Sequence, residues 1–259
     1  MTVANWNLED KKGSTPVAVS FVREPNIMAF YAGEGDKIYG VKTDDGIVSL
    51  HIDESLPVHL NLDGIFTKET VNMNLSEIYI GLPWVVNLIP NNETIRFDTG
   101  EITGNLHITG TGSDPLFEGD LMGSNITCTS PYYSPDKYGP AAVPIKLSGA
   151  MLTVPYTVVP GKTGSLWAEV SSEFVGWIPY DTVIKCGTLN GDMGLIKTKN
   201  MAFHAEGRAA TELKIEISPE LINLEGYVNF DKGHFSVPFN ELYKIPEKYS
   251  GAGPRFTMN

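Results

Sequence analysis

The sequence predicts an all-β protein: an elongated, mostly antiparallel and incompletely closed β-sheet with one or two short helical turns. Three observations predict this class. Short runs of alternating apolar and polar residues follow one another almost to the end of the chain. Most runs are separated by Gly, Pro, Asn, Asp or Ser, the residues typical of turns between antiparallel strands. A strand-turn-strand unit over 100–122 is echoed over 212–228, which favours a sheet built hairpin by hairpin.

The two copies of this unit share their local order. In the first, alternating residues lead through a Gly/Ser/Asp/Pro turn to a strand that begins Phe-Glu-Gly. In the second, an alternating strand and a turn with Pro precede a Leu-Glu-Gly start. We expect Gly119 and Gly226, which follow Glu118 and Glu225, to mark a bulge or a bend in their strands.

Strand patterns continue along nearly the whole chain. They are expected at 17–22, 29–32, 37–42, 47–52, 58–62, 70–75, 95–97, 105–109, 117–121, 125–129, 143–147, 152–158, 165–170, 182–185, 193–197, 201–206, 212–217, 223–230 and 234–237. A short helix is expected within 77–88, because apolar residues share one helical face there and Pro90 stops it. Residues 129–142 and 171–180 are expected to be irregular. The predicted organisation is a poorly ordered segment 1–15, a continuous β domain 16–243 and a tail 244–259.

Alternation also predicts which residues share a face of the sheet. One apolar set runs through the strands, with polar residues such as Asn105, His107, Lys214 and Glu216 opposite. The apolar set includes Leu106, Ile108, Ile126, Cys128, Ile145, Leu147, Leu152, Val154, Tyr156, Val158, Phe203, Leu213, Ile215, Ile217, Val228 and Phe230. Without helices to cover it, this dry face must meet a second sheet, close into a barrel or line an apolar channel.

The composition of the chain limits the classes of partner that it can bind. The chain has 259 residues, a formal net charge of −12 and a pI near 4.8. That charge repels nucleic-acid phosphates and anionic headgroups, so we expect no nucleic-acid partner and only hydrophobic contact with lipid. No apolar run approaches the ~20 residues of a membrane-spanning helix. We expect the chain to be soluble as given, and to be a piece of a longer, anchored protein.

No group of residues predicts catalysis. The five histidines are scattered, without zinc-ligand spacing, and the acidic residues fall in turns without calcium-loop spacing. Glu118 and Glu225 resemble a glycosidase carboxylate pair only superficially, because their repetition at matching positions favours a structural role. We therefore expect no enzyme activity, no metal and no cofactor. Cys128 and Cys186 are interpreted as buried thiols, with a bridge between strands as the alternative in an oxidising compartment.

Two adjoining segments resemble a known family. Residues 78–90 read Ile-Tyr-Ile-Gly-Leu-Pro-Trp-Val-Val-Asn-Leu-Ile-Pro, and residues 104–121 contain Gly-x-Leu-x-Ile-x-Gly-Thr followed by Pro-x-Phe-x-Gly-x-Leu. This order resembles the translocation and assembly module B (TamB) family and its AsmA-like relatives. The resemblance is clearest over 60–125 and continues to about residue 240. Its motifs are glycines and apolar alternation, without a catalytic signature.

The resemblance implies a long sheet folded like a taco around an apolar groove. Such proteins are anchored to the inner membrane of diderm bacteria and cross the periplasm. They are implicated in phospholipid transport to the outer membrane and in assembly of outer-membrane β-barrel proteins. For this chain it implies an internal or C-terminal-region fragment that is periplasmic and contacts phospholipid acyl chains. An inner-membrane anchor and a β-barrel partner would involve parts of the protein outside this chain.

The sequence also predicts which residues would line such a groove. Its residues are Leu106, Ile108, Ile126, Ile145, Leu147, Leu152, Val154, Phe203, Leu213, Ile215 and Phe230. The alternative is that these residues fill an ordinary sandwich core. A second functional hypothesis is a β-sandwich module that binds carbohydrate or a surface through Tyr132, Tyr133, Tyr138, Trp84, Trp167 and Trp177. A β-solenoid-like hydrolase is a third.

Overall fold

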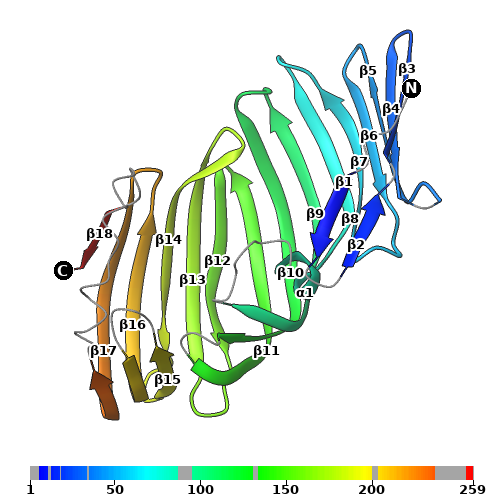
Figure 1. Ribbon diagram of the computed structural model, residues 1–259. Coiled ribbons are helices and arrows are strands. Elements are labelled where there is room, and N and C mark those ends of the chain that lie inside the picture. The colour runs from blue at the N-terminus through cyan, green and yellow to red at the C-terminus, as the bar shows by residue number, and fades with distance from the viewer. Residues whose placement is uncertain are drawn as a thin grey trace, which may run out of the picture. The chain divides into compact units, whose positions relative to one another are not determined.

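The computed structural model describes residues 6–10, 13–17, 19–33, 35–86, 95–130, 134–199, 204–236 and 255–258. Strands β3 to β17 form one long antiparallel sheet of fifteen strands, and this sheet is not closed (Figure 1). The predicted all-β, open architecture is therefore confirmed. Neighbours in the sheet follow the order of the chain, except that β14 and β15 both pair with β16.

Most strands in the second half of the sheet are longer than those in the first. The early strands are β3 Val19–Glu24, β4 Ile27–Ala32, β5 Ile38–Thr43, β6 Ile47–Ile52, β7 Val58–Phe66 and β8 Val71–Gly81. The later ones are β9 Arg96–Gly110, β10 Pro115–Ser130, β11 Ser134–Gly149, β12 Met151–Val159, β13 Leu166–Val175, β14 Ile178–Thr188, β15 Gly194–Lys199, β16 His204–Ile217 and β17 Leu221–Ser236. Strand β18, Arg255–Met258, pairs in parallel with β17, and a separate hairpin joins β1 Trp6–Asp10 to β2 Gly13–Val17.

The chain divides into two compact units. The first contains residues 1–81, 102–121 and 147–150, and the second contains residues 82–101, 122–146 and 151–259. Long strands such as β9 and β10 contribute residues to both units. The boundaries expected from the sequence, after residues 15 and 243, stay predictions.

Both copies of the repeated unit form hairpins. Strands β9 and β10 meet at a turn in which Thr111 N donates to Asp114 O, 3.1 Å away, and β16 and β17 meet at a turn closed by Ser218 N and Leu221 O, 2.9 Å apart. Pairing of β16 with β17 passes Gly226 without a shift, so the expected bulge is absent there. The register shift in this hairpin lies beside Ala209 instead.

The short helix expected within 77–88 is present as α1, Leu82–Val86, while residues 77–81 belong to strand β8, Val71–Gly81. Two other local predictions were wrong. Residues 134–142, expected to be irregular, are the first part of strand β11. Residues 171–180, also expected to be irregular, complete the hairpin of β13 and β14 with a turn at Gly176 and Trp177.

Candidate functional site

The candidate site is the apolar face of strands β12 to β17 in the second unit. Directly paired residues of antiparallel strands lie on the same face, so the register defines rows of side chains across the sheet. One row is apolar from end to end: Val154, Val170, Ile184, Ile215 and Leu224. All five are half-buried, because one side of each is packed against neighbours and the other faces outward.

Parallel rows extend this face along the strands. One contains Leu152, Ser172, Thr182, Ile217 and Ile222. The next contains Thr157, Ala168, Cys186, Leu213 and Gly226. Their polar members are small, and the Ser172 and Thr182 hydroxyls satisfy each other across 2.7 Å. The face therefore carries no charge in these three rows.

The opposite face of the same strands is charged. Its matching row is Glu169, Lys185, Lys214 and Glu225. Lys185 Nζ lies 3.3 Å from Glu169 Oε1, and Lys214 is paired with Glu216, whose hydrogen bond and charge raise the pKa of the lysine. Two faces of such different polarity confirm the predicted division into a wet and a dry side.

The first unit repeats this division. A row across β3 to β8 contains Phe21, Phe30, Gly40, Leu50, Leu62 and Leu75. The ring of Phe30 occupies the space that a side chain at position 40 would need, which explains the glycine. The neighbouring row on the other face is mostly polar, and in it His51 Nδ1 and Asn61 Oδ1 share a hydrogen bond. Asn61 Nδ2 in turn donates to Glu77 Oε2.

The structure places the predicted lining residues in two groups. Leu106, Ile108 and Leu147 belong to the first unit, where Ile108 and Leu147 are buried. Ile126, Ile145, Leu152, Val154, Leu213, Ile215 and Phe230 belong to the second unit. Of these, Leu152, Val154, Leu213, Ile215 and Phe230 share the apolar face by register. Phe203 lies outside the described residues.

A bulge in β12 shows that one prediction was wrong, namely which face of the sheet carries Tyr156 and Val158. The alternation suggested that Tyr156 and Val158 lie beside Leu152 and Val154. The register instead shifts between Val154 and Thr157, so that Val158 pairs with Trp167 on the charged face. The ring of Tyr156 stacks on Trp167 with centroids 5.2 Å apart. Pro155, at the shift, has no N–H to donate to the ladder, which suits a bulge.

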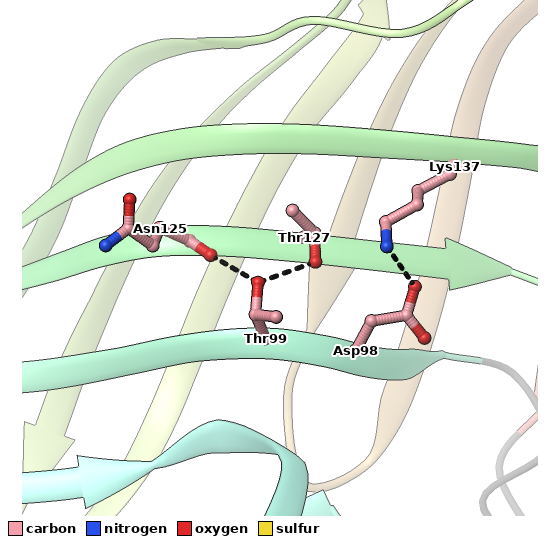
Figure 2. Close-up of polar contacts among 5 residues, drawn as sticks. All are labelled: Asp98, Thr99, Asn125, Thr127 and Lys137. Carbon is pink, nitrogen blue, oxygen red and sulfur yellow. Dashed lines mark hydrogen bonds and ion pairs between the residues drawn. The ribbon is translucent and has the colours of Figure 1, made fainter.

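Polar contacts flank Ile126 on β9 to β11. Figure 2 shows Thr99 Oγ1 within 2.7 Å of both Asn125 O and Thr127 Oγ1, and Lys137 Nζ 3.0 Å from Asp98 Oδ2. Because successive residues of a strand point to opposite faces, Asp98 and Thr99 place a polar contact on each face. The sheet is therefore less sharply divided here than in β12 to β17.

Both cysteines are free thiols. Burial raises the pKa of Cys128 and Cys186, and the nearby charge of Asp98 raises that of Cys128 further. Strands β11, β12 and β13 separate β10 from β14 in the sheet, a span of about 19 Å at ~4.8 Å per strand. A disulfide needs Cα atoms within about 7 Å, so the interpretation as separate thiols holds.

The start of β11 contains a buried polar cluster. Ser134, Asp136 and Tyr138 are all buried, and the Ser134 and Tyr138 hydroxyls lie 3.2 Å apart. Thr163 Oγ1 donates to Asp136 Oδ2. Burial raises the pKa of Tyr138. These side chains satisfy one another, so the cluster is a packing feature of β11.

Two kinds of site considered in the sequence, a metal site and a pair of glutamates, can be compared with the part of the chain that the structure describes. No three His, Cys, Asp or Glu side chains there gather as metal ligands. Glu118 accepts hydrogen bonds from Ser148 Oγ at 3.2 Å and Gly149 N at 2.9 Å. Strands β11, β12, β13, β14 and β16 lie between β10, which carries Glu118, and β17, which carries Glu225. The two carboxylates are therefore not neighbours in the sheet.

The four aromatic residues of the carbohydrate hypothesis that the structure describes lie on separate elements. Tyr138 is buried, with 5% of its surface exposed. Trp84 and Trp177 are exposed on α1 and on the β13–β14 turn, while Trp167 is half-buried under Tyr156. Tyr132 and Tyr133 lie outside the described residues. Apart from the separate β1–β2 hairpin, the described strands belong to one sheet.

Comparisons with protein-family models, curated proteins and solved structures give no match. Within the described ranges, no helix is long and apolar enough to cross a membrane. The sequence resemblance to the TamB family thus rests on its own motifs.

Sequence reasoning missed several members of the apolar face. Ile184 and Leu224 complete the central row of the second unit, and Phe30, Leu50 and Leu62 form that of the first. The alternation around each of them was visible in the sequence. What was missing was the register, which alone decides whether residues of distant strands meet.

Proposed function

We propose that the protein is a non-enzymatic segment of a periplasmic, AsmA-like lipid conduit, and that its apolar face binds phospholipid acyl chains. The observation that carries the proposal is the uncharged row Val154, Val170, Ile184, Ile215 and Leu224 on an open sheet. All five side chains keep part of their surface exposed. A sealed core would bury them more completely.

The size of this row suits an acyl chain. Five strands at ~4.8 Å spacing span about 19 Å. An acyl chain in one leaflet reaches about 15 Å, half of the ~30 Å hydrocarbon thickness of a bilayer. A chain laid across the row contacts apolar atoms along its whole length, while the headgroup stays in water at the margin of the face.

The energy of such contact is moderate, as transport requires. Full burial of a methylene is worth ~0.8 kcal/mol, and a chain on a one-sided face buries roughly half of its surface. A chain of about fourteen methylenes then gains roughly 5–6 kcal/mol relative to water. A bilayer buries the chain completely, so lipid held here is released to a membrane again.

The charge distribution supports the same reading. Charged groups such as Glu169, Lys185 and Lys214 are gathered on the other face, so they impose no desolvation cost on a bound chain. The TamB-like motifs over 78–121 support a role between inner and outer membrane, in outer-membrane biogenesis or protein assembly. The inner-membrane anchor and the β-barrel partner are part of this proposal.

A matched pair of variants tests the proposal. Ile215→Asp places a charge in the middle of the apolar row, and Thr153→Asp places the same charge on β12, on the opposite face. Native mass spectrometry of gently purified protein should detect phospholipid on the wild type and on Thr153→Asp. Bound lipid should fall at least fivefold in Ile215→Asp, which should remain folded by circular dichroism.

Two outcomes contradict the proposal. One is wild-type protein that carries no lipid after purification and takes up none from phospholipid vesicles. The other is complete unfolding of Ile215→Asp, because a half-buried position on an open face should lose only about 1–3 kcal/mol. Such unfolding indicates that the row is a sealed core.

A further inference from the structure

The tip of the β13–β14 hairpin carries the most exposed large apolar side chain of the described residues. Ile178 keeps 69% of its surface exposed, and Val175, its direct partner, keeps 59%. Trp177 and Tyr180 are also exposed. The tip sequence Phe174-Val-Gly-Trp-Ile-Pro-Tyr180 contains no charged residue.

This tip projects beyond both neighbouring strands (Figure 1). On one side, pairing of β12 with β13 ends at Met151 and Glu173. On the other, pairing of β14 with β16 begins only at Thr182 and Ile217. The seven residues 174–180 are thus held by their own hairpin, with a tight turn at Gly176, whose φ of +62° suits glycine.

The apolar tip is not an extension of the candidate lipid-binding face. Glu173 and Asp181 pair directly before it, and the register then shifts, so that Tyr180 is an extra residue on β14 and Phe174 pairs with Pro179. No residue is inserted on β13, so Val175 lies on the same side as Glu173, the charged side of the sheet, and Ile178 lies there as the direct partner of Val175. Burial within the sheet does not explain them.

We propose that this hairpin tip inserts into the surface of a neutral, zwitterionic phospholipid bilayer. Trp and Tyr have apolar bodies and polar tips, which suit the boundary between headgroups and acyl chains. Val175 and Ile178, the pair that flanks the turn, supply further apolar surface. The proposal concerns a contact separate from the acyl-chain face and does not depend on it.

The negative charge of the protein favours a neutral bilayer over an anionic one as the partner of the tip. The acidic residues Glu173 and Asp181 pair with each other directly before the tip, and the chain has a net charge of −12. These negative charges would repel anionic headgroups, whereas phosphatidylcholine has no net charge. Binding should therefore be driven by apolar contact and should change little between low and high salt.

Vesicle flotation with phosphatidylcholine liposomes tests the proposal on the intact chain. We expect wild-type protein to float with the vesicles and Ile178→Asp to bind at least tenfold more weakly. The matched control is Ile47→Asp, which removes an isoleucine that is 51% exposed, at the start of β6 in the first unit. This control should bind within twofold of wild type.

Tryptophan emission gives a second readout. The chain has four tryptophans, and only Trp177 lies in the tip. Vesicles should shift wild-type emission to shorter wavelength, and Trp177→Phe should lose that shift while still floating. Equal losses in Ile178→Asp and Ile47→Asp, or no flotation of wild type, overturn the proposal. A third outcome also overturns the proposal: the wild type is a dimer that does not bind vesicles, and Ile178→Asp is a monomer. In that case the tip is a surface for self-association.

Discussion

At the scale of single residues, the sheet depends on glycine where two backbones come unusually close. Gly226 has a φ of +141°, in a region that residues with a side chain rarely adopt. A Cβ at this position would lie 2.0 Å from Glu212 O and 2.9 Å from Leu213 Cα. The Leu-Glu-Gly element in the second copy of the sequence repeat thus marks a close approach of β16 and β17.

We predict that Gly226→Ala destabilises the fold by about 3 kcal/mol, because strain in φ adds to a clash with backbone atoms that cannot move aside. Urea unfolding followed by circular dichroism measures the change. Gly191→Ala is the control, since Gly191 also has a positive φ, +85°, but nothing lies within 4 Å of its Cβ position. It should lose only about 1 kcal/mol. Equal losses would show that the close approach is unimportant.

At the scale of elements, β11 shows how a strand escapes detection in the sequence. Its first buried positions are Ser134, Asp136 and Tyr138, and the residues between them are exposed. The period of two is therefore present, but the buried side chains are polar. Apolar alternation cannot reveal a strand whose inward residues hydrogen-bond to one another.

The buried position of Tyr138 leads to a prediction about β11. Tyr138→Ala should destabilise the protein by about 3–4 kcal/mol, because it removes a buried ring and one of the hydrogen bonds of the Ser134 hydroxyl. Tyr156→Ala, at a position with 53% exposure, should lose about 1 kcal/mol or less. Urea midpoints compare the two. If both variants were equally stable, residues 134–142 would be the surface excursion that the sequence suggested.

Other elements were predictable because their signals are local. The hairpin of β9 and β10 has its alternation and its Gly-Ser-Asp-Pro turn within some twenty residues. The bulge at Pro155 was not predictable, because a one-residue shift depends on the register with β13. That shift moved Tyr156 and Val158 to the charged face.

At the scale of the whole molecule, the open sheet leaves its apolar face available. The sequence correctly predicted that Leu152, Val154, Leu213 and Ile215 belong to the dry side, and it wrongly placed Tyr156 and Val158 there. It did not predict that these strands align Val154 with Leu224 through three intervening residues. Function is proposed for this row, so the decisive property arises from pairing between strands rather than from any local motif.

Photo-crosslinking is the most direct test of the proposed acyl-chain face. Purified protein would be loaded with phosphatidylcholine that carries a diazirine at the end of one acyl chain, irradiated, digested and analysed by mass spectrometry. We predict that crosslinks fall on the apolar row, at residues such as Ile184, Ile215 and Leu224. Crosslinks confined to the charged face around Lys185 and Lys214, or to the hairpin tip alone, would contradict binding of acyl chains by this face.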